Sequence, residues 1–214
     1  MYIYQPSRIL LKQQVKKQSH YIKGKVLDVG AGDFSRYESL FNCKEYIKMD
    51  TEKNDNIDLV GRAENMPFED GRFDSIVCTQ VFEHLDQPFK VAEEIRRVLK
   101  KGGICLLTVP QVNELHAEPV DYFRYTKYGI KKVFSRVGFE LIDYHRMGGF
   151  FTLKAQLNIR YLIDRFNLYD HKLLGRILSK FFQIYSKLMF FIDRLDKSKA
   201  NRKHTIGWCF VFRK

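Results

Sequence analysis

The residues whose types and spacing best suit chemistry lie near the start of the chain, in the run VLDVGAGD at positions 26–33. Its apolar residues suit the interior of a β-strand, whereas Gly30 and Gly32 permit positive φ and the close approach of a ligand. We expect this turn at the carboxyl end of a strand, where open α/β sheets bind ligands. Glycine-rich turns also form ordinary strand-to-helix corners, so the run becomes informative only beside its neighbours.

A second acid, Asp50, ends the next apolar run and suits a nucleoside. A carboxylate there can accept hydrogen bonds from both hydroxyls of a ribose, as in nicotinamide- and adenosylmethionine-binding proteins. A dinucleotide fold requires a third glycine at the position that Ser35 occupies. An acid two residues before the first glycine, as Asp28 is, suits the ammonium and sulfonium of adenosylmethionine better than a pyrophosphate. The pattern therefore favours adenosylmethionine.

Six blocks of sequence carry a resemblance to a known family. They are positions 26–32 (VLDVGAG), 49–50 (MD), 61–68 (GRAENMPF), 73–78 (FDSIVC), 82–85 (FEHL) and 99–103 (LKKGG). In this order they resemble the class I S-adenosyl-L-methionine-dependent methyltransferases of the type 11 group, over residues 24–145. The resemblance implies a methyltransferase whose cofactor is S-adenosyl-L-methionine.

The resemblance also implies roles for individual residues. Asp28, Gly30 and Gly32 would surround the methionine portion of the cofactor, and Asp50 would bind its ribose.

Ala63 and Glu64 would lie beside the adenine, and Gln80 would line the floor under the sulfonium. The chain departs from the family at Phe34, where a third glycine is usual, and a bulky ring there would narrow the pocket near Asp33. No metal site is expected.

Three residues beyond the fourth predicted strand are candidates for catalysis: His84, His116 and Tyr122. Methyl transfer is an in-line displacement, so the protein's main task is alignment, and a base assists when the acceptor is a hydroxyl. A histidine at the position of His84 is equally compatible with a structural hydrogen bond to a nearby carbonyl.

The run DYFRYT at positions 121–126 resembles a subset of these methyltransferases associated with bacterial surface-polysaccharide or other glycan pathways. Arg124 could pair with a carboxylate or phosphate of the substrate, and Tyr125, another candidate base, could stack on a ring. The alternative is structural: Phe123 and Tyr125 would anchor the loop to the core, and Thr126 would cap the next helix.

Apolar runs alternate with helical patterns through most of the chain. Strands are predicted at 25–30, 45–50, 58–61, 73–79, 103–109, 139–145 and 205–213, and helices at 8–22, 36–41, 88–99 and 127–137. This alternation predicts an α/β, Rossmann-like class I methyltransferase fold with a seven-stranded, mostly parallel sheet. We expect one methyltransferase domain over 1–214, comprising an N-terminal helix (1–23), a cofactor-binding core (24–145), a helical insertion (146–204) and a final strand (205–214).

Positive charge gathers in the two flanks of the 214-residue chain, whose net charge is +12. Residues 1–25 carry six Lys or Arg and no acid, residues 26–149 carry 17 basic and 21 acidic groups, and residues 150–214 carry 14 basic and four acidic groups. This asymmetry indicates an anionic partner, although a solvated basic face is the commoner explanation of any single run.

The insertion contains an amphipathic helix over 173–195. Its apolar residues at 174, 177, 178, 181, 185, 188, 192 and 195 are predicted on one face, and Arg176, Lys180, Gln183, Lys187 and Arg194 on another. Such a helix either packs over the sheet as a lid, the usual role of amphipathic helices, or lies on an anionic membrane surface. Both placements stay open, as does a combined role in sheltering a lipid-linked glycan.

The four cysteines, at 43, 78, 105 and 209, lack metal-ligand spacing and are expected to be free thiols. The chain starts without a signal-peptide pattern and contains no 18-residue apolar run, so a cytoplasmic protein, peripheral to a membrane at most, is expected. The predicted function is methyl transfer to a small-molecule or glycan acceptor, with a lipid-linked glycan among the acceptors left open. The alternatives are a nucleic-acid methyltransferase or binding protein, which is disfavoured because no target-base motif is present, and a non-catalytic membrane- or partner-binding module.

Overall fold

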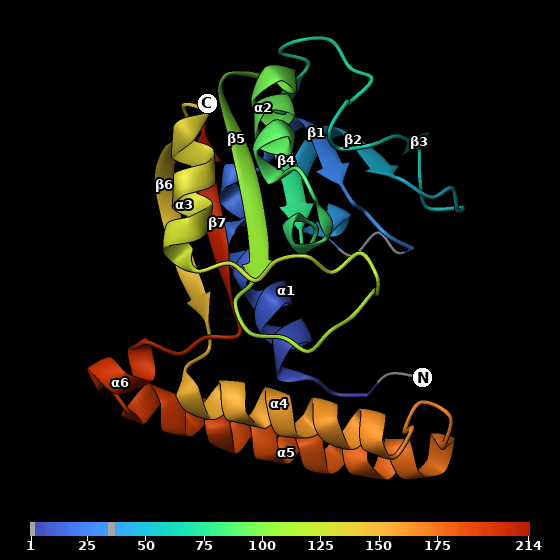
Figure 1. Ribbon diagram of the computed structural model, residues 1–214, viewed down its shortest axis with the longest axis vertical. Coiled ribbons are helices and arrows are strands. Elements are labelled where there is room, and N and C mark those ends of the chain that lie inside the picture. The colour runs from blue at the N-terminus through green and yellow to red at the C-terminus, as the bar shows by residue number, and fades with distance from the viewer. Residues whose placement is uncertain (1–2, 34–36) are drawn as a thin grey trace.

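The computed structural model describes residues 3–33 and 37–214, which form a seven-stranded sheet with helices on its faces and a helical hairpin at one end (Figure 1). The strand order is β3-β2-β1-β4-β5-β7-β6. The strands are β1 (Lys23–Val29), β2 (Asn42–Asp50), β3 (Leu59–Val60), β4 (Phe73–Thr79), β5 (Leu99–Pro110), β6 (Glu140–Met147) and β7 (Gly207–Arg213). The first five run parallel, and β7 is antiparallel to both β5 and β6. The predicted mostly parallel α/β sheet is confirmed.

Helices cover both faces of this sheet. They are α1 (Pro6–Gln18), α2 (Pro88–Val98) and α3 (Lys127–Arg136), with short 3-10 turns η1 (Ser19–Tyr21), η2 (Glu38–Leu40) and η3 (Phe82–His84). Side chains from α2 and α3 pack on one face of the central strands, and those from α1 pack on the other. Both faces of the central strands are therefore apolar, as expected of buried parallel strands.

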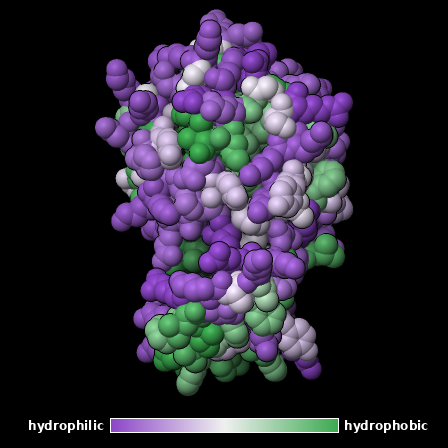
Figure 2. Space-filling view, turned by 90° about the vertical axis from the view of Figure 1, so that its left-hand side faces the viewer, coloured by the Kyte–Doolittle hydropathy of each residue, from purple (hydrophilic) through white to green (hydrophobic). Residues whose placement is uncertain are grey.

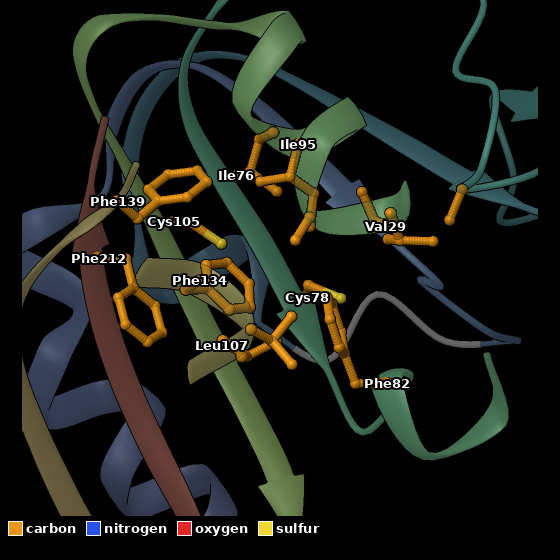
Figure 3. Close-up of a cluster of buried hydrophobic side chains, with 14 of the residues drawn as sticks. Val29, Ile76, Cys78, Phe82, Ile95, Cys105, Leu107, Phe134, Phe139 and Phe212 are labelled. Atoms are coloured by element: carbon orange, nitrogen blue, oxygen red, sulfur yellow. The ribbon is translucent and has the colours of Figure 1, made fainter. Parts of the chain in front are cut away.

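The larger core lies between the sheet and the helices α2 and α3 (Figure 3). Alternate residues of each strand point into it, such as Val29 of β1 and Cys78 of β4, because successive side chains in a strand face opposite sides. Phe134 of α3 stacks on Phe212 of β7, with ring centroids 4.3 Å apart. The core thereby fixes the central strands whose carboxyl ends carry the site. All four cysteines are free, as predicted.

The predicted helix at 36–41 is wrong for the described part of that segment, where the structure has only the one-turn η2. Tyr37 and Phe41, on either side of η2, are buried in the second core cluster. Burying these two rings anchors the segment without a full helix. Two predictions concern Phe34, expected to narrow the pocket, and Ser35, which stands where a dinucleotide fold requires glycine. Both residues lie outside the described part of the chain.

The insertion forms a hairpin of two long helices, α4 (Phe150–Arg165) and α5 (Lys172–Leu195), followed by the short α6 (Lys199–Arg202). The hairpin lies beyond the carboxyl end of β5, beside α1 (Figure 1). Asp193 of α5 accepts hydrogen bonds from the backbone N–H groups of Gly149, Phe151 and Thr152 and so caps α4. None of the described helices is long and apolar enough to cross a membrane.

Candidate active site

The glycine turn leaves β1 with the backbone conformation that the sequence predicts. Gly30 and Gly32 have φ values of 72° and 68°, and a Cβ atom at Gly30 would collide with the side chain of Val81. The N–H of Gly30 donates to the carbonyl of Met49 at 2.9 Å, which ties the turn to β2. Glycine at position 30 is therefore required both by conformation and by the space available.

Asp50 connects the end of β2 to this turn. One carboxylate oxygen accepts from the N–H of Gly32 at 2.9 Å, and the other accepts from the N–H of Thr51 at 2.6 Å. A carboxylate has about four lone-pair sites, so these bonds leave capacity for further donors. Asp50 thus has a fixed orientation and can still accept hydrogen bonds from a ligand.

Asp28 is held differently, because its side chain is buried behind the turn. The hydroxyl of Tyr46 donates to its carboxylate at 2.7 Å. Burial raises the pKa of Asp28 to about 7, against the lowering effect of that hydrogen bond. Asp28 and Gly32 do not line the open cleft, so their predicted contact with the methionine portion of the cofactor stays a prediction.

Beside the turn lies an open cleft of about 610 Å³, within the usual range for small-ligand sites. Of the predicted cofactor-contacting residues, those that line it are Gly30, Asp50, Ala63, Glu64 and Gln80. Among the described residues, the charged lining is mainly acidic, with four carboxylates, those of Asp50, Glu52, Glu64 and Asp86, against one guanidinium. A cleft with apolar walls and an acidic rim fits a ligand that combines a nucleoside with positively charged sulfonium and ammonium groups.

Gln80, directly after β4, lies where this cleft meets a second pocket. It lines both, and it has a positive φ of 56°, which is uncommon outside glycine. Its N–H donates to the carbonyl of Thr108 at 3.0 Å, and its side-chain amide donates to the Thr108 hydroxyl at 3.2 Å. These bonds to β5 hold an otherwise strained residue at the junction.

The second pocket, of about 270 Å³, lies between α1, the residues after β5, and α4. Sequence reasoning missed its charged residues, because Arg8 lies on the N-terminal helix and Arg160 on the insertion, far apart in the chain. Arg160 pairs with Glu114, with a nitrogen-to-oxygen distance of 2.5 Å, and Gln156 accepts from the N–H of Ser7 at 3.0 Å. These residues come to line one pocket only in the folded protein, and no local pattern in the sequence marks them.

The three predicted catalytic residues gather where the two pockets meet. The rings of His84 and His116 lie edge to face with centroids 4.9 Å apart, and Tyr122 lines the cleft. The Nδ1 atom of His84 lies 2.6 Å from the carbonyl of Val120, so Nδ1 carries the proton and Nε2 keeps its lone pair. The expected structural hydrogen bond is thus present and also sets the tautomer that a general base requires.

Glu83 adds a carboxyl group to this pair of histidines. It is fully buried, neither of its carboxylate oxygens has a hydrogen-bond partner among the described residues, and burial raises its pKa to about 8. Ligand atoms of Glu83, His84 and His116 lie within 4.8 Å of one another, close enough to hold a metal ion, whereas the sequence predicts no metal. Sequence reasoning passed over Glu83 because buried acids are rare and nothing local marks this one as buried.

The predicted substrate-binding residues have internal partners. Arg124 makes a bidentate pair with Asp121, at 2.6 and 2.7 Å, and also donates to the carbonyl of Glu114 at 2.8 Å. Tyr125 is buried and donates from its hydroxyl to the carbonyl of Phe82 at 3.2 Å, while Thr126 caps α3. Both side chains therefore stabilise the loop, as in the structural alternative, and their predicted contact with substrate stays a prediction.

A mostly parallel sheet with an antiparallel β7, together with a glycine turn and an acid at the carboxyl edge, is the arrangement expected of a class I methyltransferase fold. Comparison with known proteins agrees. Residues 27–107 match a protein family described as a methyltransferase domain. The chain is 29% identical over 138 residues to the ubiquinone/menaquinone biosynthesis C-methyltransferase UbiE of Klebsiella pneumoniae, a match covering 47% of this chain and 55% of that protein.

Two experimental structures have the same fold. A putative methyltransferase from Bacillus halodurans superposes with a TM-score of 0.59 at 17% identity, covering 95% of this chain and 98% of the other. Phosphoethanolamine N-methyltransferase 2 of Haemonchus contortus, in complex with S-adenosyl-L-methionine, gives a TM-score of 0.56 at 19% identity, covering 94% and 51%. The chain spans about half the length of the first curated relatives that it matches.

Residues 27–107 therefore match the methyltransferase-domain family, and the fold of the chain is that of a solved methyltransferase structure. The recognition made from the six sequence blocks is confirmed for this part of the chain.

Proposed function

We propose that the protein transfers the methyl group of S-adenosyl-L-methionine to a small-molecule or glycan acceptor bound between α1 and α4. The observation that carries this proposal is the junction at Gln80, which lines both the acidic cleft and the second pocket. A donor on one side and an acceptor on the other would meet at this residue. Bringing two reactants together in line is the largest contribution a protein makes to this displacement.

On the donor side, the chain's own residues bind and orient. The bound cofactor supplies an electrophilic methyl group on a sulfonium. Asp50 would accept hydrogen bonds from the ribose, and Glu64, whose carboxylate lies 3.4 Å from the guanidinium of Arg62, would lie beside the adenine. Gly30 keeps the turn free of a side chain that would fill the cleft.

At the junction, His84 is the proposed base. Its Nε2 lone pair can accept a proton from an acceptor hydroxyl, while its Nδ1–H remains bound to the carbonyl of Val120. His116, whose Nδ1 lies 3.0 Å from the carbonyl of Glu114, is oriented in the same way and lines the second pocket. The pair thus offers two oriented imidazoles, and Tyr122 contributes a hydroxyl beside them.

The second pocket favours a polar acceptor. Its lining combines amide and hydroxyl groups with two arginines and a carboxylate. These residues are Gln5, Ser7, Arg8, Asn113, Glu114, Gln156 and Arg160. Such groups recognise hydroxyls and anionic substituents, which a glycan or a hydroxylated small molecule carries. Two relatives act, by their names, in quinone biosynthesis and on phosphoethanolamine, so acceptors of very different chemistry occur on this fold.

A radiometric transfer assay tests the proposal. The protein is incubated with methyl-tritiated S-adenosyl-L-methionine and a fractionated extract of the source cell, and label is counted in the organic phase, the aqueous phase and precipitated nucleic acid. Label in a small-molecule or glycan fraction that disappears with Asp50→Ala supports the proposal, and Asp55→Ala, an exposed acid nearby, is the matched control. Label confined to nucleic acid, or none with intact cofactor binding, would refute it.

A further inference from the structure

The outward side of α5 exposes a continuous row of large apolar side chains. Seven large apolar side chains form a stripe along it, three or four residues apart: Leu173, Ile177, Phe181, Ile184, Leu188, Phe191 and Leu195. Each is between 47% and 75% exposed. Figure 2 shows hydrophobic residues gathered at the lower end of the molecule, where Figure 1 places the hairpin. We call this stripe the outer face.

Three faces run along α5 rather than the two that the sequence predicts. Phe182 and Ser186 are buried against α4, and Leu178 and Tyr185, predicted on the apolar face, pack toward the same cluster. The outer face lies next to this buried side around the helix and forms a second apolar surface. The basic residues Lys172, Arg176, Lys180, Lys187 and Arg194 form the third face, consistent with 3.6 residues per turn.

The face of α5 that contains Phe182 and Ser186 already attaches this helix to the rest of the protein. Its main contacts are with α4, and α4 in turn contacts α1. The outer face is therefore not needed to hold the hairpin in place. Contiguous exposed apolar surface of this kind marks an interaction site in a folded protein.

Charge decides between the possible occupants. The α5 helix carries five basic residues and a single acid, Asp193, whose carboxylate is committed to the backbone at the start of α4. A second copy docked on the outer face would bring two basic faces together, which opposes association. An anionic lipid surface supplies the complementary charge for the basic face and an apolar layer for the stripe.

We propose that the outer face of α5 docks the protein on an anionic lipid membrane, with the helix lying in the plane of the headgroups. The apolar side chains enter the boundary between headgroups and acyl chains, and the adjacent Lys and Arg side chains contact lipid phosphates. The second pocket lies on the other side of α4, so docking places it roughly 20 Å, about two helix diameters, from the lipid. Docking itself needs neither cofactor nor acceptor and is independent of the proposed function.

Vesicle flotation tests this proposal with the full chain and no cofactor. Vesicles of phosphatidylcholine alone are compared with vesicles that also contain phosphatidylglycerol. The apolar variant is Phe181→Gln/Ile184→Gln/Leu188→Gln, and the charge variant is Arg176→Glu/Lys180→Glu/Lys187→Glu. Matched controls on the sheet domain are Tyr128→Gln, at a side chain 71% exposed, and Lys44→Glu/Lys101→Glu/Lys132→Glu, at exposed lysines.

The wild-type protein and both controls are expected to float with the anionic vesicles and to bind neutral vesicles far more weakly. The charge variant should lower the partition coefficient by on the order of 100-fold or more, because each of the three basic groups near an anionic surface contributes about fivefold. The apolar variant should lower it by on the order of 100-fold, because three large apolar side chains no longer enter the lipid boundary. Circular dichroism confirms that the variants are folded. Absence of flotation, flotation that survives both α5 variants, or a dimer in light scattering that the apolar variant dissociates would each overturn the proposal.

Discussion

The cleft beside the glycine turn and the outer face of α5 are opposite in shape, charge and origin. The cleft is concave and acidic, and its polar groups are held by hydrogen bonds from neighbouring strands. The outer face is convex and apolar, with a basic face beside it, and depends on a single helix. The excess positive charge of the chain therefore lies in its two flanks and not in the lining of the acidic cleft, and α5 carries part of it. We propose that this part meets a partner other than the cofactor.

The largest expected effect comes from adding a side chain at Gly30, which lines the cleft. Gly30→Ala should abolish cofactor binding and destabilise the fold, because its Cβ collides with Val81 and its φ is positive. Gly102→Ala is the control, since Gly102 also has a positive φ but open space around it. We expect Gly102→Ala to cost about 1 kcal/mol in the free energy of unfolding and to leave binding intact. Equal effects of the two changes, measured by denaturant unfolding and calorimetry, would contradict the steric argument.

A second test separates chemistry from binding at the junction. His84→Ala should lower kcat by about 10²–10⁴-fold on a hydroxyl acceptor, because the base and its fixed tautomer are lost. His84 lines the acidic cleft, but its proposed role is to accept the proton of the acceptor, so cofactor affinity should change much less than kcat. Single-turnover kinetics with the labelled acceptor measures the first quantity and calorimetry the second. A fall in cofactor affinity with unchanged kcat would assign His84 to cofactor binding instead.

Removing the proposed ribose ligand, Asp50, should give a smaller effect. Asp50→Ala should weaken S-adenosylhomocysteine binding by about 10–100-fold, since a hydrogen bond to a charged group contributes about 1.5–3 kcal/mol. Part of that loss comes from the turn, because Asp50 also accepts from Gly32. Titration calorimetry against Asp55→Ala measures it. Unchanged affinity would exclude Asp50 from the cofactor site.

The buried acid behind the histidines predicts a pH dependence of stability. The pKa of Glu83 is raised to about 8 by burial, so the neutral carboxyl favours the folded state at acidic pH. That advantage is lost as the pH rises from the ordinary pKa of about 4.5 to about 8, with a slope of up to about 1.4 kcal/mol per pH unit from this one group. Glu83→Gln should remove this contribution and leave that of Asp28, whose pKa is raised to about 7, so the slope between pH 7 and 8 should fall most, as urea unfolding at a series of pH values would show. The same slope in the variant would mean that other groups cause it.

The smallest expected effect tests whether the two regions are independent. The triple change Phe181→Gln/Ile184→Gln/Leu188→Gln should alter cofactor affinity by less than about twofold and the free energy of unfolding by about 1.5 kcal/mol or less, because a single exposed substitution usually changes it by no more than about 0.5 kcal/mol. Calorimetry and thermal unfolding measure both. A large loss of cofactor affinity would show that the outer face and the cleft are coupled.

The sequence specifies the cofactor side of this molecule well because its signals are local. The turn at Gly30 and Gly32 and the acid at the end of β2 follow from strand patterns and from the conformational freedom of glycine. The strand order brings Asp50 to the turn through parallel pairing of β1 and β2. Adjacent parallel strands end at the same edge of a sheet, so this proximity is predictable.

The acceptor side is less predictable because it is assembled from distant segments. Arg8 and Arg160 meet only once α4 packs beside α1, and no periodicity in either helix records that packing. The burial of α5 is equally hard to predict from the sequence. Residues 173–195 place apolar side chains on two adjacent sides of the helix, and only the position of α4 shows which side is buried. Arg124 looked like a ligand for an anion, but Asp121, three residues before it, takes its guanidinium.

A crystal structure of the protein grown with S-adenosylhomocysteine would show where the cofactor binds. We expect the ribose on Asp50, the adenine beside Ala63 and Glu64, and the sulfur next to Gln80, facing the pocket between α1 and α4. A ligand bound elsewhere, or a cleft that stays empty at millimolar concentrations of the ligand, would contradict this expectation.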